Sequence, residues 1–237
     1  MSISAQYTTT RLELQRVITH TLARARFDAD GRFGLRVTPS GLGTPAFGPD
    51  GDVIRIAGDA LIREFRNDGT ARSATVVLAG RSLRELAAFA AVDLAKPFSA
   101  GTDTPDLGDV DAPIALDADA AETLTDWLRV GSLALDRVLP TTHEPSVAQV
   151  WPEHFDIGLD VATGHGRVNL GASPGDNDYP EPYLYVSPWE GSPPGDTTFW
   201  NAPFGAVMSG GDGKSVAEHV RDAVTFFETA LGLLGRG

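Results

Sequence analysis

The stretch of sequence that decides the fold runs from residue 155 to residue 170 and reads Phe155-Asp-Ile-Gly-Leu-Asp-Val-Ala-Thr-Gly-His-Gly-Arg-Val-Asn-Leu170. Residues Phe155–Val161 alternate between apolar and polar types, which is the period of a β-strand with one face in the core. A short turn containing glycine leads to a second strand-like run, Arg167–Leu170. Because strands joined by so short a turn pair antiparallel, we expect an antiparallel sheet.

Further strand-like runs lie on both sides of this stretch, and Gly, Pro and Asp residues separate them. Such residues favour the tight turns that join neighbouring strands, so these runs extend the antiparallel pattern. The predicted strands are Phe33–Thr38, Val53–Ala57, Ala74–Ala79, Tyr183–Val186 and Phe204–Val207.

Four helices are predicted from the capping box, in which a Ser, Thr or Asp precedes the helix and a Glu follows three residues later. The pairs are Thr10–Glu13, Ser82–Glu85, Asp119–Glu122 and Ser215–Glu218. Apolar residues at helical spacing follow each pair and predict the helices Leu12–Ala25, Leu83–Val92, Ala120–Leu139 and Val216–Leu234. The last helix is expected to bury a stripe formed by Val220, Val224, Phe227 and Leu231.

Together these elements predict an α+β fold, mainly an antiparallel sheet with the four helices packed on one face. We expect a single domain over residues 1–237. Its halves, 1–95 and 114–237, would be joined by the Pro/Gly/Asp-rich segment 96–113. Each half reads helix, strands, helix. The string F-G-P-D-G-D at 47–52 also echoes A-S-P-G-D-N at 172–177. An internal duplication is one interpretation of this echo, and a shared preference for turn residues is the other.

Composition excludes several classes of partner and site. The 237 residues carry a net charge of −13, which argues against a nucleic-acid partner and against docking on an anionic membrane. Acidity could favour a cationic ligand, although a solvated acidic surface is the commoner reason for it. No cysteine, no signal-like N-terminus and no long apolar run occur, so a cytoplasmic location is expected. Arginine far outnumbers lysine, as in bacteria with high-GC genomes.

The region 151–204 holds the candidate ligand-binding residues. Three of the four tryptophans and three of the four tyrosines lie there, between prolines and glycines. Aromatic side chains in such rigid surroundings can stack on a ligand or a partner, or form a second layer of core packing. The candidates are Trp151, Tyr183, Tyr185, Trp189, Trp200 and Asn201.

His154 and Asp156 are the candidate catalytic residues. If the strand included both, they would share one face and could act as a base with its orienting carboxylate. The same pair could supply two metal ligands, but no spacing selects a third, so no metal site is predicted. A structural, hydrogen-bonded histidine is the alternative.

No complete catalytic signature occurs elsewhere in the sequence, and the cofactor, if any, is left open. The patterns G-x-G-x-x-G, H-E-x-x-H and G-x-S-x-G are absent. The acids between Gly175 and Glu181 superficially suit calcium, yet a hairpin loop explains them better because Asp and Asn favour turns. Whether the protein is an enzyme stays open.

Three strings carry a resemblance: W-P-E-H-F-D at 151–156, G-A-S-P-G-D at 171–176 and P-E-P-Y-L-Y-V at 180–186. They resemble a group of uncharacterised actinobacterial proteins, and the first is similar to the W-P-x-H-F-D string of a larger domain family of unknown function. The resemblance covers about 150–204 and implies no reaction, cofactor or fold.

Two functions of different class are therefore expected. One is a soluble protein with a small-molecule or metal-dependent site in 151–204. The other is a non-catalytic interaction or structural module that uses the aromatic segment as an interface. The partners compatible with them are a small-molecule ligand or further copies of the chain in a homo-oligomer.

Overall fold

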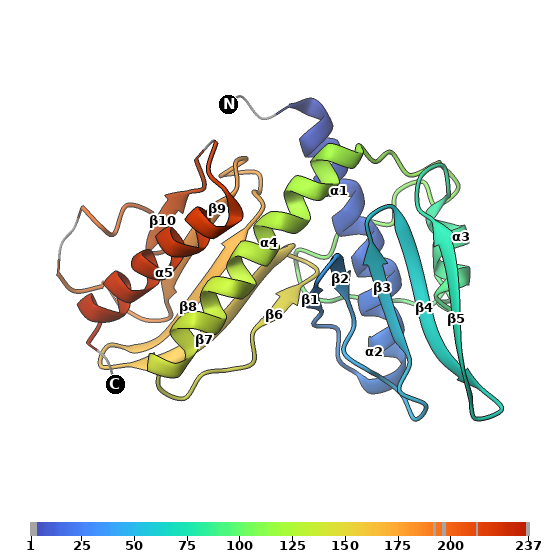
Figure 1. Ribbon diagram of the computed structural model, residues 1–237, viewed down its shortest axis with the longest axis horizontal. Coiled ribbons are helices and arrows are strands. Elements are labelled where there is room, and N and C mark those ends of the chain that lie inside the picture. Colours follow the sequence, from blue (N-terminus) through green and yellow to red (C-terminus); the bar gives the residue numbers. More distant parts are fainter. Residues whose placement is uncertain (1–3, 192, 196–197, 212, 236–237) are drawn as a thin grey trace. The chain divides into compact units, whose positions relative to one another are not determined.

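The computed structural model describes residues 4–191, 193–195, 198–211 and 213–235 and confirms the α+β fold. The chain divides into two compact units. The N-terminal unit contains Ser2–Thr125 and Val150–Phe155, and the C-terminal unit contains Asp126–Gln149 and Asp156–Gly237. Two five-stranded antiparallel sheets are present, and in each the strands pair in the order in which they occur along the chain (Figure 1).

The first helix is longer than the sequence predicts. It comprises α1 (Ala5–Ile18), a π-helical segment (Thr19–Ala23) and α2 (Arg24–Asp30), and it ends at Gly31 with a φ of 69°. The predicted start at Thr10 is wrong because Ser4 caps the helix instead, with its side chain accepting from the Tyr7 N–H. The Thr10 hydroxyl is buried and accepts a hydrogen bond from the Asp117 N–H.

The first sheet consists of β1 (Arg36–Thr38), β2 (Gly41–Gly43), β3 (Val53–Ala57), β4 (Ala60–Asn67) and β5 (Thr70–Val77). The prediction of β3 is confirmed, and those of β1 and β5 overlap the strands found. The sequence did not reveal β4, because Arg63-Glu-Phe-Arg66 places charges on both faces of the strand. The inner face of the sheet buries Ile54, Ile56 and Leu61.

The remainder of the N-terminal unit contains one short helix and a long irregular segment. The helix α3 (Leu83–Phe89) has the predicted capping box between Ser82 and Glu85. Segment 96–113 contains turns, bends and irregular chain and forms one isolated bridge, from Pro113 to Ser82. This segment lies wholly within the N-terminal unit, and the division between the units falls inside the next helix.

That helix, α4 (Ala118–Val138), passes from one unit into the other between Thr125 and Asp126, and a 3₁₀ turn (Leu139–Thr141) follows it. The predicted capping box at Asp119 is wrong by two residues, because the Asp117 carboxylate accepts from the Ala120 N–H at 2.9 Å. The second sheet follows, with β6 (Gln149–Trp151), β7 (Asp156–Thr163), β8 (Gly166–Ser173), β9 (Tyr183–Pro188) and β10 (Ala206–Ser209), and the chain then forms α5 (Val216–Leu233).

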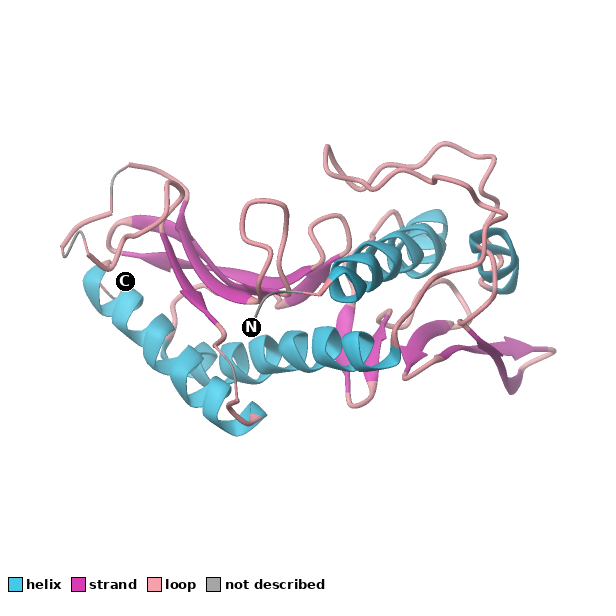
Figure 2. Ribbon diagram, turned by 90° about the horizontal axis from the view of Figure 1, so that it is seen from above, coloured by secondary structure: helices cyan, strands magenta, loops and turns pink. Residues whose placement is uncertain are grey.

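Within the C-terminal unit, α5 and the part of α4 from Asp126 onward lie on the same side of the sheet (Figure 2). Gly131 allows α4 to approach closely, since a Cβ there would be 2.6 Å from the side chains of Ala172 and Ile157. The capping box of Ser215 and Glu218 is confirmed at the start of α5. The helix buries Val220, Phe227 and Leu231 as predicted, and Val224 is half-buried.

Both sheets are preceded and followed by helices, so the order helix, five strands, helix occurs twice along the chain. The duplication interpretation rests in part on this order. No helix within the described ranges has both the length and the apolar character needed to cross a membrane.

Candidate functional site

The side of the second sheet opposite its helices carries a set of tyrosine, glycine and acidic residues that we call the aromatic face. Apolar residues such as Ile157 and Ala172 point toward α4, so their neighbours along each strand point the other way. The strand register aligns these outward residues across β7, β8 and β9. The aromatic face consists of Asp156, Gly158, Asp160, Asn169, Gly171, Ser173, Tyr183 and Tyr185.

Tyr185 lies flat across the middle of this face. A Cβ added to Gly158 would be 2.7 Å from the Tyr185 hydroxyl oxygen, and one added to Gly171 would overlap the ring itself. The hydroxyl donates a hydrogen bond to the Asp156 carboxylate. Burial, followed by the charge of Asp156, raises the pKa of Tyr185 well above its ordinary value. The two glycines therefore make room for a neutral tyrosine that is bonded to the candidate catalytic carboxylate.

Tyr183 is fixed in a similar way by a second carboxylate. Its hydroxyl donates to Asp176, and burial together with Asp176 raises its pKa. The Asp176 carboxylate also accepts from the backbone N–H groups of Asp178 and Tyr179, at 2.8 and 2.7 Å. Asp176 thus holds the loop between β8 and β9 in place, as the hairpin-loop interpretation of this segment expects.

A row of aromatic rings continues outward from Tyr185. The ring centroids of Tyr185 and Tyr183 are 6.2 Å apart, and those of Tyr183 and Tyr179 are 5.3 Å apart. Phe204 packs edge-on against Tyr179 at 6.0 Å and is 40% exposed. The row thus runs from the centre of the sheet to an exposed ring.

Trp189, at the end of β9, is the other exposed aromatic residue here, with 57% of its surface accessible. Its indole N–H donates to the Asn169 side chain at 2.8 Å. The Arg167 guanidinium lies 5.7 Å from its ring centroid and forms an ion pair with Asp160. One cation, Arg167, therefore already lies at the border of the aromatic face, beside an indole ring and an acid.

Two further candidates have structural contacts instead. The indole N–H of Trp200 donates to the Pro194 carbonyl at 2.9 Å, and its ring packs edge-on against Phe199, which contacts Phe226 of α5. The Asn201 side chain donates to the Val207 carbonyl and accepts from the Val207 N–H, at 3.0 and 2.8 Å. Asn201 therefore occupies the outer edge of β10.

The remaining candidates, Trp151 and His154, belong to the N-terminal unit. Trp151 packs against Phe33 with the ring centroids 6.1 Å apart. The His154 side chain is 54% exposed, and its Nδ1 lies 3.5 Å from the Asp103 carboxylate. The strand β7 begins only at Asp156, because Phe155 is buried with a φ of 55°. The expectation that His154 and Asp156 share a strand face is therefore wrong.

No protein-family model, no curated protein and no solved structure matches this chain. Functional interpretation rests on the geometry of the residues. Within the ranges that the structure describes, no group of three or more His, Asp and Glu side chains could hold a metal ion.

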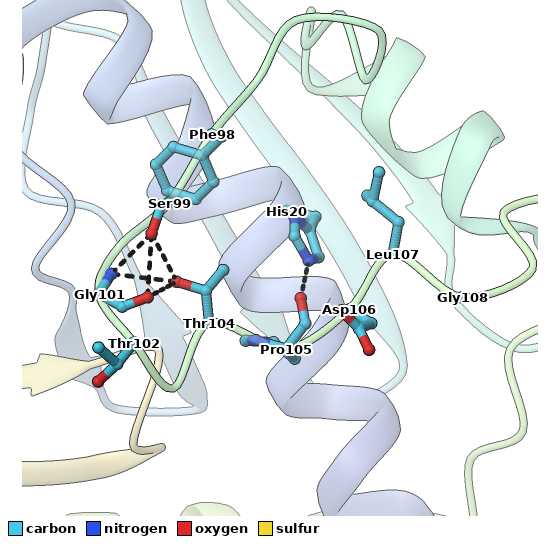
Figure 3. A pocket seen from close by; sticks show the side chains of 10 residues that line it. All are labelled: His20, Phe98, Ser99, Gly101, Thr102, Thr104, Pro105, Asp106, Leu107 and Gly108. Atoms are coloured by element: carbon cyan, nitrogen blue, oxygen red, sulfur yellow. Dashed lines mark hydrogen bonds between the residues drawn. The ribbon is translucent and has the colours of Figure 1, made fainter.

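A cavity of about 580 Å³ lies in the N-terminal unit, between His20 and the loop 98–108 (Figure 3). His20 is buried, with 4% of its surface exposed. Its Nε2 donates to the Pro105 carbonyl at 2.7 Å, which fixes the proton on that nitrogen because a carbonyl only accepts. The hydroxyls of Ser99 and Thr104 bond to each other and to Gly101 (Figure 3).

His20 is one of three side chains that hold the irregular segment. Arg16, His20 and Arg24 are spaced four residues apart, and each donates to a backbone carbonyl of that segment. Their acceptors are Leu107 at 2.8 Å, Pro105 at 2.7 Å and Lys96 at 3.1 Å, respectively. Hydrogen bonds from side chains of one helix therefore hold the backbone of the segment that borders the cavity.

The sequence contains a signal for the aromatic face that is independent of any catalytic motif. Gly158 and Gly171 are glycines inside strands, and such glycines often mark a place where another group approaches the backbone closely. Asn169 and Arg167 had no comparable signal, because their contacts with Trp189 depend on the register of β8 and β9.

Proposed function

We propose that the protein is a non-catalytic binding module whose C-terminal unit binds a basic peptide segment of a partner protein at the exposed aromatic rings that border the aromatic face. The observation that carries the proposal is the combination of exposed rings, Trp189 and Phe204, with a strongly acidic surrounding. Trp and Phe faces attract Arg and Lys side chains, and nearby carboxylates add to that attraction.

Most of the charged residues around the aromatic face are acidic. Between residues 156 and 190 the chain has six acidic residues and a single arginine. Arg167 is already paired with Asp160. The exposed acids Asp178, Glu181 and Glu190 lie in the loops that border the face. A peptide with several Arg or Lys residues matches this distribution, whereas an acidic peptide would be repelled.

The bonding of Asp156 favours binding over catalysis. A small-molecule or metal-dependent site in 151–204 would require Asp156 to act as a base or a ligand. Its carboxylate accepts the hydroxyl hydrogen of Tyr185, whose raised pKa keeps that hydroxyl protonated. Both groups would have to give up this contact before reacting, whereas stacking on Trp189 and Phe204 requires no such change.

The test is a titration with a short arginine-rich peptide and with a glutamate-rich peptide of the same length, by calorimetry and by tryptophan fluorescence. The arginine-rich peptide is expected to bind saturably and more weakly at high salt, because screening reduces the attraction. Trp189→Ala should raise its Kd by roughly tenfold or more.

A matched pair of variants separates recognition by this face from attraction by the net charge. Asp178→Asn/Glu181→Gln/Glu190→Gln removes three charges at the face. Asp126→Asn/Asp136→Asn/Glu228→Gln removes three from helices on the other side of the sheet. Only the first variant should weaken binding. Equal weakening by both, or an absence of saturable binding to the wild type, contradicts the proposal.

A further inference from the structure

The strand β5 forms an open edge of the first sheet, because it is last in the strand order and pairs only with β4. The Leu78 N–H donates to the Asp59 carbonyl, so Asp59 and Leu78 form a hydrogen-bonded pair. Such pairs alternate with non-bonded pairs along antiparallel strands. The residues of β5 whose backbone N–H and C=O groups point away from β4 are therefore Ala71, Ser73, Thr75 and Val77.

These four residues are all exposed, and Val77 has 49% of its surface accessible. Within the described part of the chain, no hydrogen bond reaches their outward backbone groups. Proteins usually protect such an edge with proline, inward-pointing charges or a bulge. The strand has no proline, and its only charged residue is Arg72.

The second sheet shows how this same chain protects an edge. Its last strand, β10, has Val207 with both backbone groups bonded to the Asn201 side chain. The strands at the other ends of the two sheets, β1 and β6, have only three residues each. Among the edge strands in the described residues, β5 is therefore the one long strand whose outward backbone groups are not covered by a side chain.

We propose that β5 pairs antiparallel with β5 of a second copy of the chain, across a two-fold axis at Ala74. This register places Ala71 opposite Val77 and Ser73 opposite Thr75, so every outward N–H and C=O gains a partner. Small side chains face β-branched ones across the pair, and no like charges are opposed. The interface is isologous, and the two five-stranded sheets become one continuous sheet.

The charge distribution favours a second copy at this edge. The whole chain carries a net charge of −13, which makes two copies repel each other. The region 53–77 has four arginines and three acids, so it is almost neutral. Two copies that approach along β5 therefore bring together the surfaces that repel least.

The test measures the mass of the intact protein in solution by light scattering, from roughly 10 μM to 1 mM, where interfaces of this modest size associate. The wild type should approach twice the 25.1 kDa mass of the chain as the concentration rises. Ser73→Lys/Thr75→Lys and Ser73→Glu/Thr75→Glu each place like charges opposite one another. Each should weaken the dimer by roughly tenfold or more.

Mixing the two double variants places Lys opposite Glu and should restore the dimer, which a merely misfolded variant would not do. Thr225→Glu/Thr229→Glu, which adds the same charge on exposed α5 positions, should leave dimerisation unchanged. A wild type that stays monomeric throughout, or double variants that dimerise like the wild type, would overturn the proposal.

Discussion

Tyr185 shows how a single residue can determine the character of a whole sheet face. Its ring takes the space that side chains at Gly158 and Gly171 would fill, and its hydroxyl reaches Asp156 on β7. The ring therefore spans three neighbouring strands. Replacement of either glycine by alanine would push a methyl group into the ring, so the three positions form one packing unit.

We expect Tyr185→Phe to destabilise the protein by about 1–3 kcal/mol, because it removes a buried hydrogen-bond donor from Asp156. Urea unfolding at pH 7 measures this loss. The same variant should also change how the free energy of unfolding depends on pH in the alkaline range. Unfolded tyrosine loses its proton near pH 10, whereas folded Tyr185 keeps it, so stability falls as the pH rises above about 10.

Because the pKa values of Tyr183 and Tyr7 are also raised, Tyr185→Phe should reduce that alkaline loss without abolishing it. A pH dependence in the alkaline range identical to that of the wild type would show that Tyr185 ionises normally in the folded state.

His20 should contribute to the loss of folding stability at acidic pH. Burial lowers its pKa, aided by Arg16 and Arg24, while Asp106 and the Pro105 carbonyl act in the opposite direction. Below about pH 6.5 the unfolded state takes up a proton that folded His20 does not, so stability falls as the pH falls. His20→Gln keeps an N–H donor for the Pro105 carbonyl and should make the decline between pH 7 and pH 5 shallower.

The pKa of His219 is also lowered, by burial and by Lys214, so His219→Gln should make the decline shallower as well, and His20→Gln alone should leave part of it. If the two variants and the wild type lose stability with the same slope, the burial of His20 has no effect on its ionisation.

At the scale of elements, α5 has the apolar stripe that its sequence predicts, and Phe227 is the largest of its fully buried residues. Phe227→Ala should cost about 3–5 kcal/mol, whereas Val224→Ala, at a half-buried position, should cost less than about 1.5 kcal/mol. Midpoints of urea unfolding at unchanged slope give both values. Equal effects of the two changes would mean that the stripe is not packed as described.

Helix starts were predictable only where the local motif and the tertiary structure agree. The boxes at Ser82 and Ser215 are both formed, because each serine has an extended backbone and directly precedes the first helical residue. Thr10 and Glu13 have the same spacing, but the helix already begins at Ala5. A motif of four residues contains no information about Ser4 or about the partner of Thr10 elsewhere in the chain.

At the scale of the whole molecule, alternating residues and short turns sufficed to predict antiparallel sheets, because both are local properties. The candidate site depended on more distant relations. Tyr183, Tyr185 and Trp189 do lie on or beside one face with Asp156. His154 is separated from that strand by the positive φ of Phe155, which no neighbouring residue type predicts.

The π-helical segment in the first helix also affects everything that follows it on that helix. The Arg24 N–H bonds to the Thr19 carbonyl, five residues earlier, so one turn holds an additional residue. Since each residue of an α-helix rotates the chain by about 100°, this turn shifts the phase of α2 relative to α1. A simple helical wheel drawn through residues 5–30 would therefore misplace the side chains of α2 relative to those of α1.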